Sequence, residues 1–256
     1  LPLAARAGSV STELVRMLEA LGVEMSFGVV GGAISQLCHA LDQSKIAYLH
    51  FRHETGAAFA ALEASLATKK PTVVFTTSGP GLTNALTGMS AARWDGGHVI
   101  LISASTSPAH RGRVATQETS ASTLPSNGLF LSGPPFHYAT SIEHPAQLDA
   151  VVAELARGLR RKDGFIAHLS LPIALQGERA PRPARLPLEP APPPVVAAET
   201  GAFYAELLAG KRLVMWVGFG ARHAAPQILD FAQRSGARVM ASPRAKGVFP
   251  EDHPQY

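Results

Sequence analysis

The sequence predicts an α/β protein in which a doubly wound parallel sheet is followed by part of a second, smaller α/β domain. Two observations support this prediction. Short β-branched and apolar runs alternate with segments of helical periodicity, and glycine-rich turns follow several of the runs. The runs are almost continuously apolar, which is typical of parallel strands that are covered by helices on both faces.

The first predicted domain spans residues 1–171. Ser11 is expected to cap its first helix, because apolar residues then recur at helical spacing until Gly22. Alternation of strands and helices continues to residue 169, which gives five or six strands. We expect strands at residues 25–30, 46–51, 72–77, 98–104 and 165–169, and helices at residues 34–41, after Glu54, after Gly81 and at residues 145–160.

Polar chemistry is concentrated between Phe51 and Asn84. A strand ends in Arg52, His53 and Glu54, and the next strand ends in the turn Ser78-Gly79-Pro80-Gly81. The carboxyl ends of parallel strands open onto the same crevice, where ligands bind in open sheets. We therefore expect Glu54 and the glycine turn to face one site.

Three further segments differ in composition from the sheet. Residues 105–138 form a long loop, which in a compact domain is usually functional or mobile. Residues 172–198 are rich in proline and are expected to form a semi-rigid linker. Residues 199–256 begin a Rossmann-like domain, with helices at 200–208 and 224–235 and strands at 213–217 and 238–241. Two strands cannot bury both faces of a sheet, so we expect this domain to be incomplete in the chain.

Composition argues against several classes of partner. The chain has 256 residues, 46% hydrophobic and 16% charged residues, and a formal charge of +4. Its basic residues are scattered and are not interleaved with aromatic residues, so a nucleic-acid-binding function is not favoured. No apolar run approaches the length of a membrane span. Cys38 is the single cysteine, which suits a reducing compartment, and we expect a cytoplasmic protein that is not bound to a membrane.

The pair His53-Glu54, the alanine-rich helix after it and the run VVFTTSGPGLTNAL together resemble a known family. They are similar to the pyrimidine-binding domain of thiamine-diphosphate-dependent enzymes of the acetolactate synthase and 2-oxo acid decarboxylase family. The runs LGVEMSFGVVGG, RVATQET and KGVFPEDHPQY stand at similar spacings, so the resemblance covers nearly the whole chain. It implies the thiamine-diphosphate-binding fold, with a pyrimidine-binding domain at residues 1–171 and part of the middle domain after the linker.

The resemblance also implies partners. A third domain would carry the motif that binds the diphosphate and Mg²⁺, and the sequence contains no GDG followed by asparagine at the expected spacing. Mg²⁺ and the diphosphate would then be held by a C-terminal fragment or a partner chain, within a homodimer or tetramer. No metal site is expected in this chain, because its histidines and its single cysteine lack metal-ligand spacing.

Five site residues follow from the resemblance. Glu54 would hydrogen-bond the N1′ atom of the aminopyrimidine; the alternative is a first-turn glutamate that only interacts with the helix dipole. Pro80 and Asn84 would lie beside the same ring, and Gly79 would let the backbone approach it. Gly31 belongs to the glycine turn near the start of the family pattern. A plain strand-to-helix turn is the alternative for the residues around Pro80.

Other polar residues have two open interpretations. Gln117 matches a glutamine near the reacting centre, where its amide could donate to a developing oxyanion, and it could equally be a surface residue. His53 is either a partner of Glu54 or a strand-end residue. His110 and His137 lie in the long loop and could handle protons or be simply exposed.

Two stretches leave specificity open. Val30 stands where the family frequently has proline, so the resemblance does not define the substrate pocket. The stretch WVGFGARH, residues 216–223, has two glycines after a strand and no third, which is a weak dinucleotide fingerprint. The matching region of the family sometimes contacts FAD or ADP, so FAD is a candidate second cofactor.

The sequence therefore predicts a thiamine-diphosphate-dependent lyase or carboligase that acts on a 2-oxo acid, with acetolactate-synthase-like chemistry. This chain would supply the activating Glu54. Two alternatives are a simple 2-oxo acid decarboxylase and a non-catalytic nucleotide-binding or regulatory subunit with the same fold.

Overall fold

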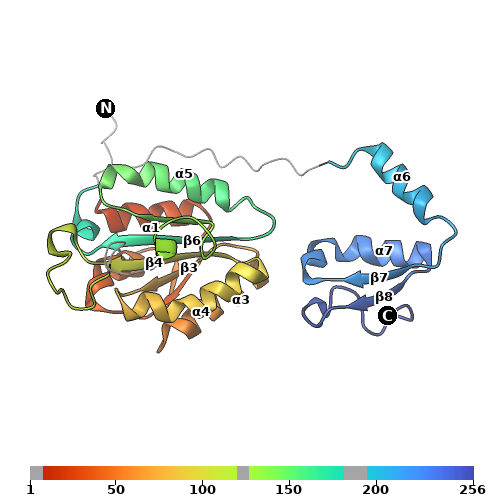
Figure 1. Ribbon diagram of the computed structural model, residues 1–256, viewed down its shortest axis with the longest axis horizontal. Helices are drawn as coiled ribbons and strands as arrows, with labels where there is room; N and C mark the ends of the chain where they lie inside the picture. Colours follow the sequence, from red (N-terminus) through yellow and green to blue (C-terminus); the bar gives the residue numbers. More distant parts are fainter. Residues whose placement is uncertain (1–7, 120–126, 182–194) are drawn as a thin grey trace. The chain divides into compact units, whose positions relative to one another are not determined.

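The computed structural model describes residues 8–119, 127–181 and 195–256. The chain divides into two compact units, Leu1–Pro190 and Ala191–Tyr256, which are described one at a time below (Figure 1). Within the described ranges, no helix is both long enough and apolar enough to cross a membrane.

The described part of the first unit contains a six-stranded sheet in the order β2-β1-β3-β4-β6-β5, and every neighbouring pair is parallel. The chain adds β2 on one side of β1 and all later strands on the other side, so the winding direction reverses between β1 and β3. The prediction of a doubly wound parallel sheet is confirmed. The strands are β1 (Met25–Gly28), β2 (Ala47–His50), β3 (Thr72–Thr76), β4 (His98–Ser105), β5 (Tyr138–Ser141) and β6 (Phe165–Pro172).

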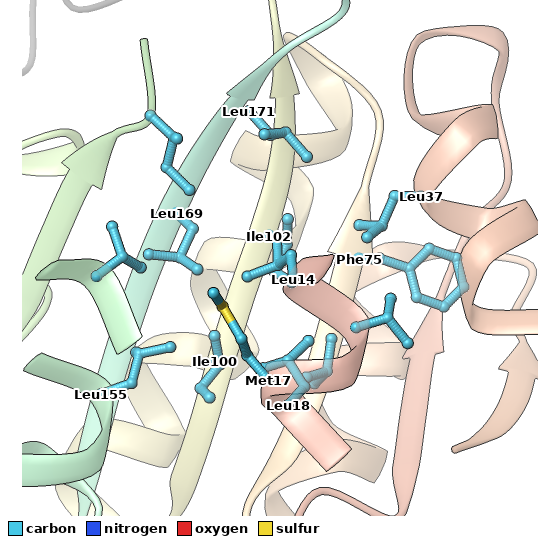
Figure 2. Packing of buried hydrophobic residues seen from close by; sticks show 14 of the residues in the cluster. Leu14, Met17, Leu18, Leu37, Phe75, Ile100, Ile102, Leu155, Leu169 and Leu171 are labelled. Atoms are coloured by element: carbon cyan, nitrogen blue, oxygen red, sulfur yellow. The ribbon is translucent and has the colours of Figure 1, made fainter. Parts of the chain in front are cut away.

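Helices cover both faces of this sheet (Figure 1). On one face, Leu14, Met17 and Leu18 of α1 pack against Ile100 and Ile102 of β4 (Figure 2). Burial of each large aliphatic side chain stabilises the fold by about 1.5–3 kcal/mol. The helices of this face are α1 (Val10–Ala20), α2 (Ser35–Asp42) and α5 (Leu148–Gly158), and those of the other face are α3 (Glu54–Thr68) and α4 (Pro80–Asp95).

Two local expectations were wrong. Ser9, not Ser11, caps α1: its backbone is extended and its side chain accepts a hydrogen bond from the backbone N–H of Thr12 at 3.2 Å. Ser11 already lies inside the first turn and is buried. Strand β5 had no predicted position, because it starts at the end of the predicted long loop and its sequence, YATS, lacks an apolar run; it pairs with β6 at the edge of the sheet.

The beginning of the predicted linker, residues 172–198, packs against the first unit. Leu175 is buried in its core, and the side-chain amide of Gln176 donates to the carbonyl oxygen of Ala33 at 2.7 Å. The backbone N–H of Ala180 donates to the carbonyl oxygen of Gly8 at 3.0 Å. This stretch therefore belongs to the first unit, and residues 182–194 of the predicted linker lie outside the described residues.

The second unit is small. Its parallel strands β7 (Val214–Val217) and β8 (Arg238–Ala241) are connected through α7 (Ala225–Ser235), and α6 (Ala198–Leu208) precedes them. Trp216 on β7 is 78% exposed, so within the described part of this unit no layer covers that part of the sheet. The parallel strands joined through a helix confirm the expected Rossmann-like α/β fold of this unit.

A buried histidine links β4 and β6 to the loop before β5. Nε2 of His168 lies 2.8 Å from Oγ of Ser103, and Nδ1 lies 2.5 Å from the carbonyl oxygen of Leu129. A carbonyl oxygen only accepts, so Nδ1 carries the proton and Nε2 accepts from the serine hydroxyl. The rings of Phe130 and Phe136 flank the imidazole. Complete burial lowers the pKa of His168 to about 4.

We predict that acid destabilises the first unit through this histidine. Below pH 6.5 His168 is protonated in the unfolded chain, whereas in the folded chain it stays neutral down to about pH 4. The free energy of unfolding is therefore highest above pH 6.5 and falls as the pH decreases. The loss between pH 7 and pH 4 is about 3 kcal/mol from this group. The measurement is the thermal unfolding midpoint against pH for the wild type and His168→Gln.

The glutamine keeps one donor and one acceptor and removes the titration, so the variant should lose less stability in acid than the wild type. His137, whose pKa burial also lowers to about 4, remains in both proteins and contributes equally to their acid sensitivity. Identical pH dependence in the two proteins would contradict the assignment.

Candidate functional site

The candidate site lies where the winding of the sheet reverses, at the carboxyl ends of β1 and β3. Gly31 follows β1, and a β-carbon added to it would lie 2.1 Å from Cγ2 of Thr77, which follows β3. A β-carbon on Gly81 would lie 2.9 Å from Oγ1 of the same threonine. Gly31 therefore permits the close approach of the loops that follow β1 and β3, and Gly81 permits the tight turn that follows β3.

Glu54 begins α3 directly behind the end of β2. His53 caps the helix, since its Nδ1 accepts from the backbone N–H of Thr55 at 3.2 Å. Only 8% of Glu54 is exposed. Its Oε2 accepts from Nδ2 of Asn84 at 3.1 Å, and its Oε1 faces Gly81, 3.4 Å from the position of an added β-carbon. The carboxylate is thus fixed next to the glycine turn, as expected.

Close packing of α3 and α4 brings Asn84 to Glu54. The hydroxyl of Thr55 donates to the carbonyl oxygen of Asn84 at 2.5 Å. One helical turn further on, a β-carbon on Gly88 would lie 2.5 Å from Cβ of Ala58, so the helices touch through their smallest residues. The alanine-rich composition of α3 therefore serves this contact, and the contact sets the distance between amide and carboxylate.

Gly79 makes the sharp turn between β3 and α4. Its φ of 59° and ψ of −114° are accessible to glycine, and Pro80 follows as the exposed first residue of α4. A β-carbon on Gly79 would lie 3.0 Å from Cβ of Gln117. Gln117 is exposed and has a positive φ of 54°. The long loop thus places Gln117 across the glycine turn that borders Glu54.

Sequence reasoning missed the threonines that hold this loop. The backbone N–H of Thr106 donates to the carbonyl oxygen of Thr119 at 3.0 Å, and the N–H of Thr119 donates to Oγ1 of Thr106 at 3.0 Å. The hydroxyl of Thr119 also donates to the carbonyl oxygen of Gln117 at 2.8 Å. The threonine two residues after the glutamine was the available signal, but its partner is 13 residues away and becomes adjacent only in the fold.

Two histidines of the long loop do not join the site. His110 is exposed in a short 3₁₀ helix. His137 stacks on Phe165 with a centroid distance of 5.9 Å. Phe165 begins β6, so this histidine lies near the amino ends of the strands, opposite the carboxyl ends where the candidate site lies. Burial, followed by the charges of Arg93 and Arg161, lowers the pKa of His137 to about 4.

The site fits a flat, hydrogen-bonding heteroaromatic ring. Gly81 presents no side chain toward Oε1 of Glu54, and the buried carboxylate offers an oxygen to a ring nitrogen. An aminopyrimidine has this shape and this hydrogen-bonding capacity. Among the residues that the structure describes, no group of three or more histidine, cysteine, aspartate or glutamate residues could hold a metal ion.

Comparison with known proteins identifies the family. Residues 9–124 match the family model for the N-terminal TPP-binding domain of thiamine pyrophosphate enzymes, and residues 202–256 match the model for the central domain of the same enzymes. Together the two models cover more than half of the chain. The chain belongs to the thiamine pyrophosphate enzyme family and is related to acetolactate synthase large subunits.

Similar proteins extend well beyond the matching region. The chain is 31% identical over 254 residues to a "Probable acetolactate synthase large subunit" of Methanocaldococcus jannaschii. This alignment covers 94% of this chain and 41% of that protein. The chain is 30% identical over 253 residues to an acetolactate synthase of Mycobacterium avium, with 95% and 39% covered. The chain thus spans about two fifths of the length of these relatives.

A solved structure supports the fold. It is an X-ray structure of a protein assigned as a thiamin diphosphate-dependent enzyme from Mycobacterium smegmatis, with a TM-score of 0.80 at 22% identity. The similarity covers 97% of this chain and 47% of the other.

We predict that Gly31→Ala destabilises the first unit by about 1–3 kcal/mol, because the new methyl group overlaps Cγ2 of Thr77. Gly32→Ala is the matched control, since nothing lies within 4 Å of its added β-carbon. Thermal unfolding midpoints measure the effect. Adding Thr77→Ser removes the overlapping methyl group and should restore much of the stability; equal midpoints for the two single variants would show that the close approach is not required.

Proposed function

We propose that this chain is the N-terminal part of a thiamine-diphosphate-dependent lyase or carboligase that acts on a 2-oxo acid with acetolactate-synthase-like chemistry. The observation that supports the proposal is the buried carboxylate of Glu54, held by Asn84 beside the Gly79 turn at the switch point of the sheet. A first-turn glutamate that served only the helix dipole would be expected to point into solvent.

Each site residue has a role in this proposal. When bound, thiamine diphosphate supplies the carbon nucleophile and the electron sink for decarboxylation. Glu54 holds a proton at N1′ of the aminopyrimidine, and Asn84 keeps the carboxylate in place by donating to Oε2. Gly31, Gly79 and Pro80 shape the space for the ring, and the amide of Gln117 donates to the oxyanion that develops on the substrate.

The proposal includes parts that this chain does not supply. The diphosphate and its Mg²⁺ would be bound by a third domain, in a C-terminal fragment or partner chain, and the enzyme would be a homodimer or tetramer. The family to which the chain belongs, and the exposed Trp216 on the small sheet of the second unit, support this arrangement. The free, buried thiol of Cys38 supports a cytoplasmic location.

Two alternatives share the site. A simple 2-oxo acid decarboxylase would release an aldehyde, whereas a carboligase joins two substrate molecules, so product analysis with pyruvate separates them. The relatives named acetolactate synthase favour carboligation. A non-catalytic regulatory subunit with the same fold would give neither product when combined with the diphosphate-binding domain.

We predict that Glu54→Gln in the holoenzyme slows exchange of the C2 proton of bound thiamine diphosphate by about 10²–10⁴-fold, the usual contribution of one acid–base group. Exchange in deuterated buffer, stopped by acid and read by proton NMR, measures the effect. Glu63→Gln is the control, because Glu63 lies on the same helix and is exposed. Unchanged exchange in Glu54→Gln, with the cofactor still bound, would defeat the assignment.

A second candidate function, binding of FAD or ADP, rests on an arginine pair in the second unit. The guanidinium groups of Arg222 and Arg244 lie 4.5 and 4.9 Å from the ring centroid of Phe219, in the turns that follow β7 and β8. Nε of Arg222 is buried and has no hydrogen-bond partner among the described residues. Two stacked guanidinium groups at parallel strand ends suit a diphosphate.

We predict that the purified holoenzyme shows flavin absorbance or retains ADP, and that Arg222→Met lowers nucleotide affinity by about tenfold, as expected for loss of one charge-assisted contact. Arg234→Met is the control, because Arg234 forms only a surface ion pair with Asp230 on α7. Nucleotide content is measured by absorbance after heat release. A holoenzyme without nucleotide, and without affinity for added FAD or ADP, would exclude this function.

A further inference from the structure

The loop from Thr106 to Thr119 carries backbone strain. Val114 has a φ of 59° and Gln117 a φ of 54°, in the left-handed region that residues with side chains rarely adopt. For a β-branched residue such as Val114 this conformation is an outlier, and such strain persists only where surrounding contacts impose it. Strained residues cluster at functional sites, and the surrounding structure holds them in place.

Hydrogen bonds within the loop close its base and its tip. The reciprocal bonds of Thr106 and Thr119 close the base, and the backbone N–H of Gly112 donates to Oε1 of Glu118 at 2.5 Å across the tip. These bonds fix the shape of the loop. They do not by themselves fix its orientation on the sheet, because all of these partners lie within the loop.

Two side chains of the loop contact the body of the unit: Oγ of Ser107 accepts from the backbone N–H of Ala174 at 2.9 Å, next to the start of the loop, and Arg111 makes the contact nearer the tip. Nη2 of Arg111 donates to Oε1 and Oε2 of Glu143 at 2.8 and 2.9 Å, and its Nε donates to the carbonyl oxygen of Thr106 at 3.2 Å. The side chains of Arg111 and Glu143 are 26% and 37% exposed, so water screens them only in part. One guanidinium group thus joins the base of the loop to a residue beyond β5.

Glu143 is itself held rigidly. It lies between β5 and α5, and its backbone N–H and that of His144 both donate to Oε1 of Gln147, at 2.7 and 2.8 Å. His144 completes a capping box by accepting from the backbone N–H of Ala146. These bonds fix the backbone of Glu143 at the start of a capped helix, so its side chain reaches Arg111 from a rigid position.

We propose that the Arg111–Glu143 ion pair is a positioning clamp that sets the loop, and with it Gln117, at the glycine turn of the candidate site. The effect on turnover rests on the proposed function of Gln117, whereas the effect on the loop rests on the contacts alone. Arg111 and Glu143 touch neither substrate nor cofactor in this account. A partly exposed pair of this kind shifts an equilibrium by about fivefold, which is enough to order a loop and too little to hold a domain together.

The test compares Arg111→Met with Arg157→Met in the holoenzyme. Arg157 forms a similar surface ion pair, with Glu154 on α5, so the control removes an ion pair without touching the loop. In Arg111→Met we expect amide hydrogen exchange at residues 112–119 to rise about fivefold and kcat to fall about fivefold, with little change in KM, in cofactor affinity or in the unfolding midpoint. Arg111→Lys should restore part of both effects, because lysine keeps the charge but cannot donate to Glu143 and to the carbonyl oxygen of Thr106 with the fixed geometry of a guanidinium group.

The outcomes separate the clamp from the proposed function. Unchanged exchange at residues 112–119 in Arg111→Met overturns the clamp, whatever happens to turnover. Faster loop exchange in that variant, with Glu54→Gln leaving C2 proton exchange unchanged, supports the clamp and overturns the proposed function of the site. An equal loss of kcat in the Arg157→Met control would show that the effect is not specific to the loop, and this too overturns the clamp.

Discussion

The hydrogen bond from Asn84 to Glu54 is the interaction on which the rest of the site depends. A carboxylate that is almost completely removed from water is costly to bury unless a donor satisfies it, and a donor can reach it only if α3 and α4 lie very close together. The small residues at the contact, among them Ala58 and Gly88, permit that approach. The residues at the helix contact therefore control the hydrogen bond at the site, since a larger residue between the helices would move the amide of Asn84 away from the carboxylate of Glu54.

The parallel sheet provides the second constraint. Because its winding reverses between β1 and β3, the loops that follow these strands diverge into helices on opposite faces and leave a crevice at their carboxyl ends. Gly31 and Thr77 approach each other closely at these strand ends, and Glu54 lies next to Gly81 of the turn that follows β3. The same geometry serves many ligands in other proteins, so the fold alone does not define the reaction. The buried carboxylate and the family to which the chain belongs narrow the choice to thiamine diphosphate chemistry.

Much of the fold and of the candidate site could be predicted from the sequence, because its signals are local. Apolar runs located five of the six strands described in the first unit, and the proximity of Glu54 to the glycine turn followed from the rule that the carboxyl ends of parallel strands lie on the same side of a sheet. What escaped prediction depends on tertiary contacts. Strand β5 is ordered by its pairing with β6. The capping role of Ser9 depends on the pairing of residues 8–10 with residues 178–180. Thr106 and Thr119 bond to each other only after the long loop has folded back.

The central claim is that Glu54 shares a proton with N1′ of the aminopyrimidine, and the most direct measurement is the ¹⁵N NMR shift of that atom in bound thiamine diphosphate labelled at N1′. The account predicts a shift displaced from that of the free cofactor toward the protonated ring in the wild-type holoenzyme. It also predicts a return toward the free value in Glu54→Gln, because an uncharged amide cannot hold the proton there. The same N1′ shift in both bound proteins would contradict the account.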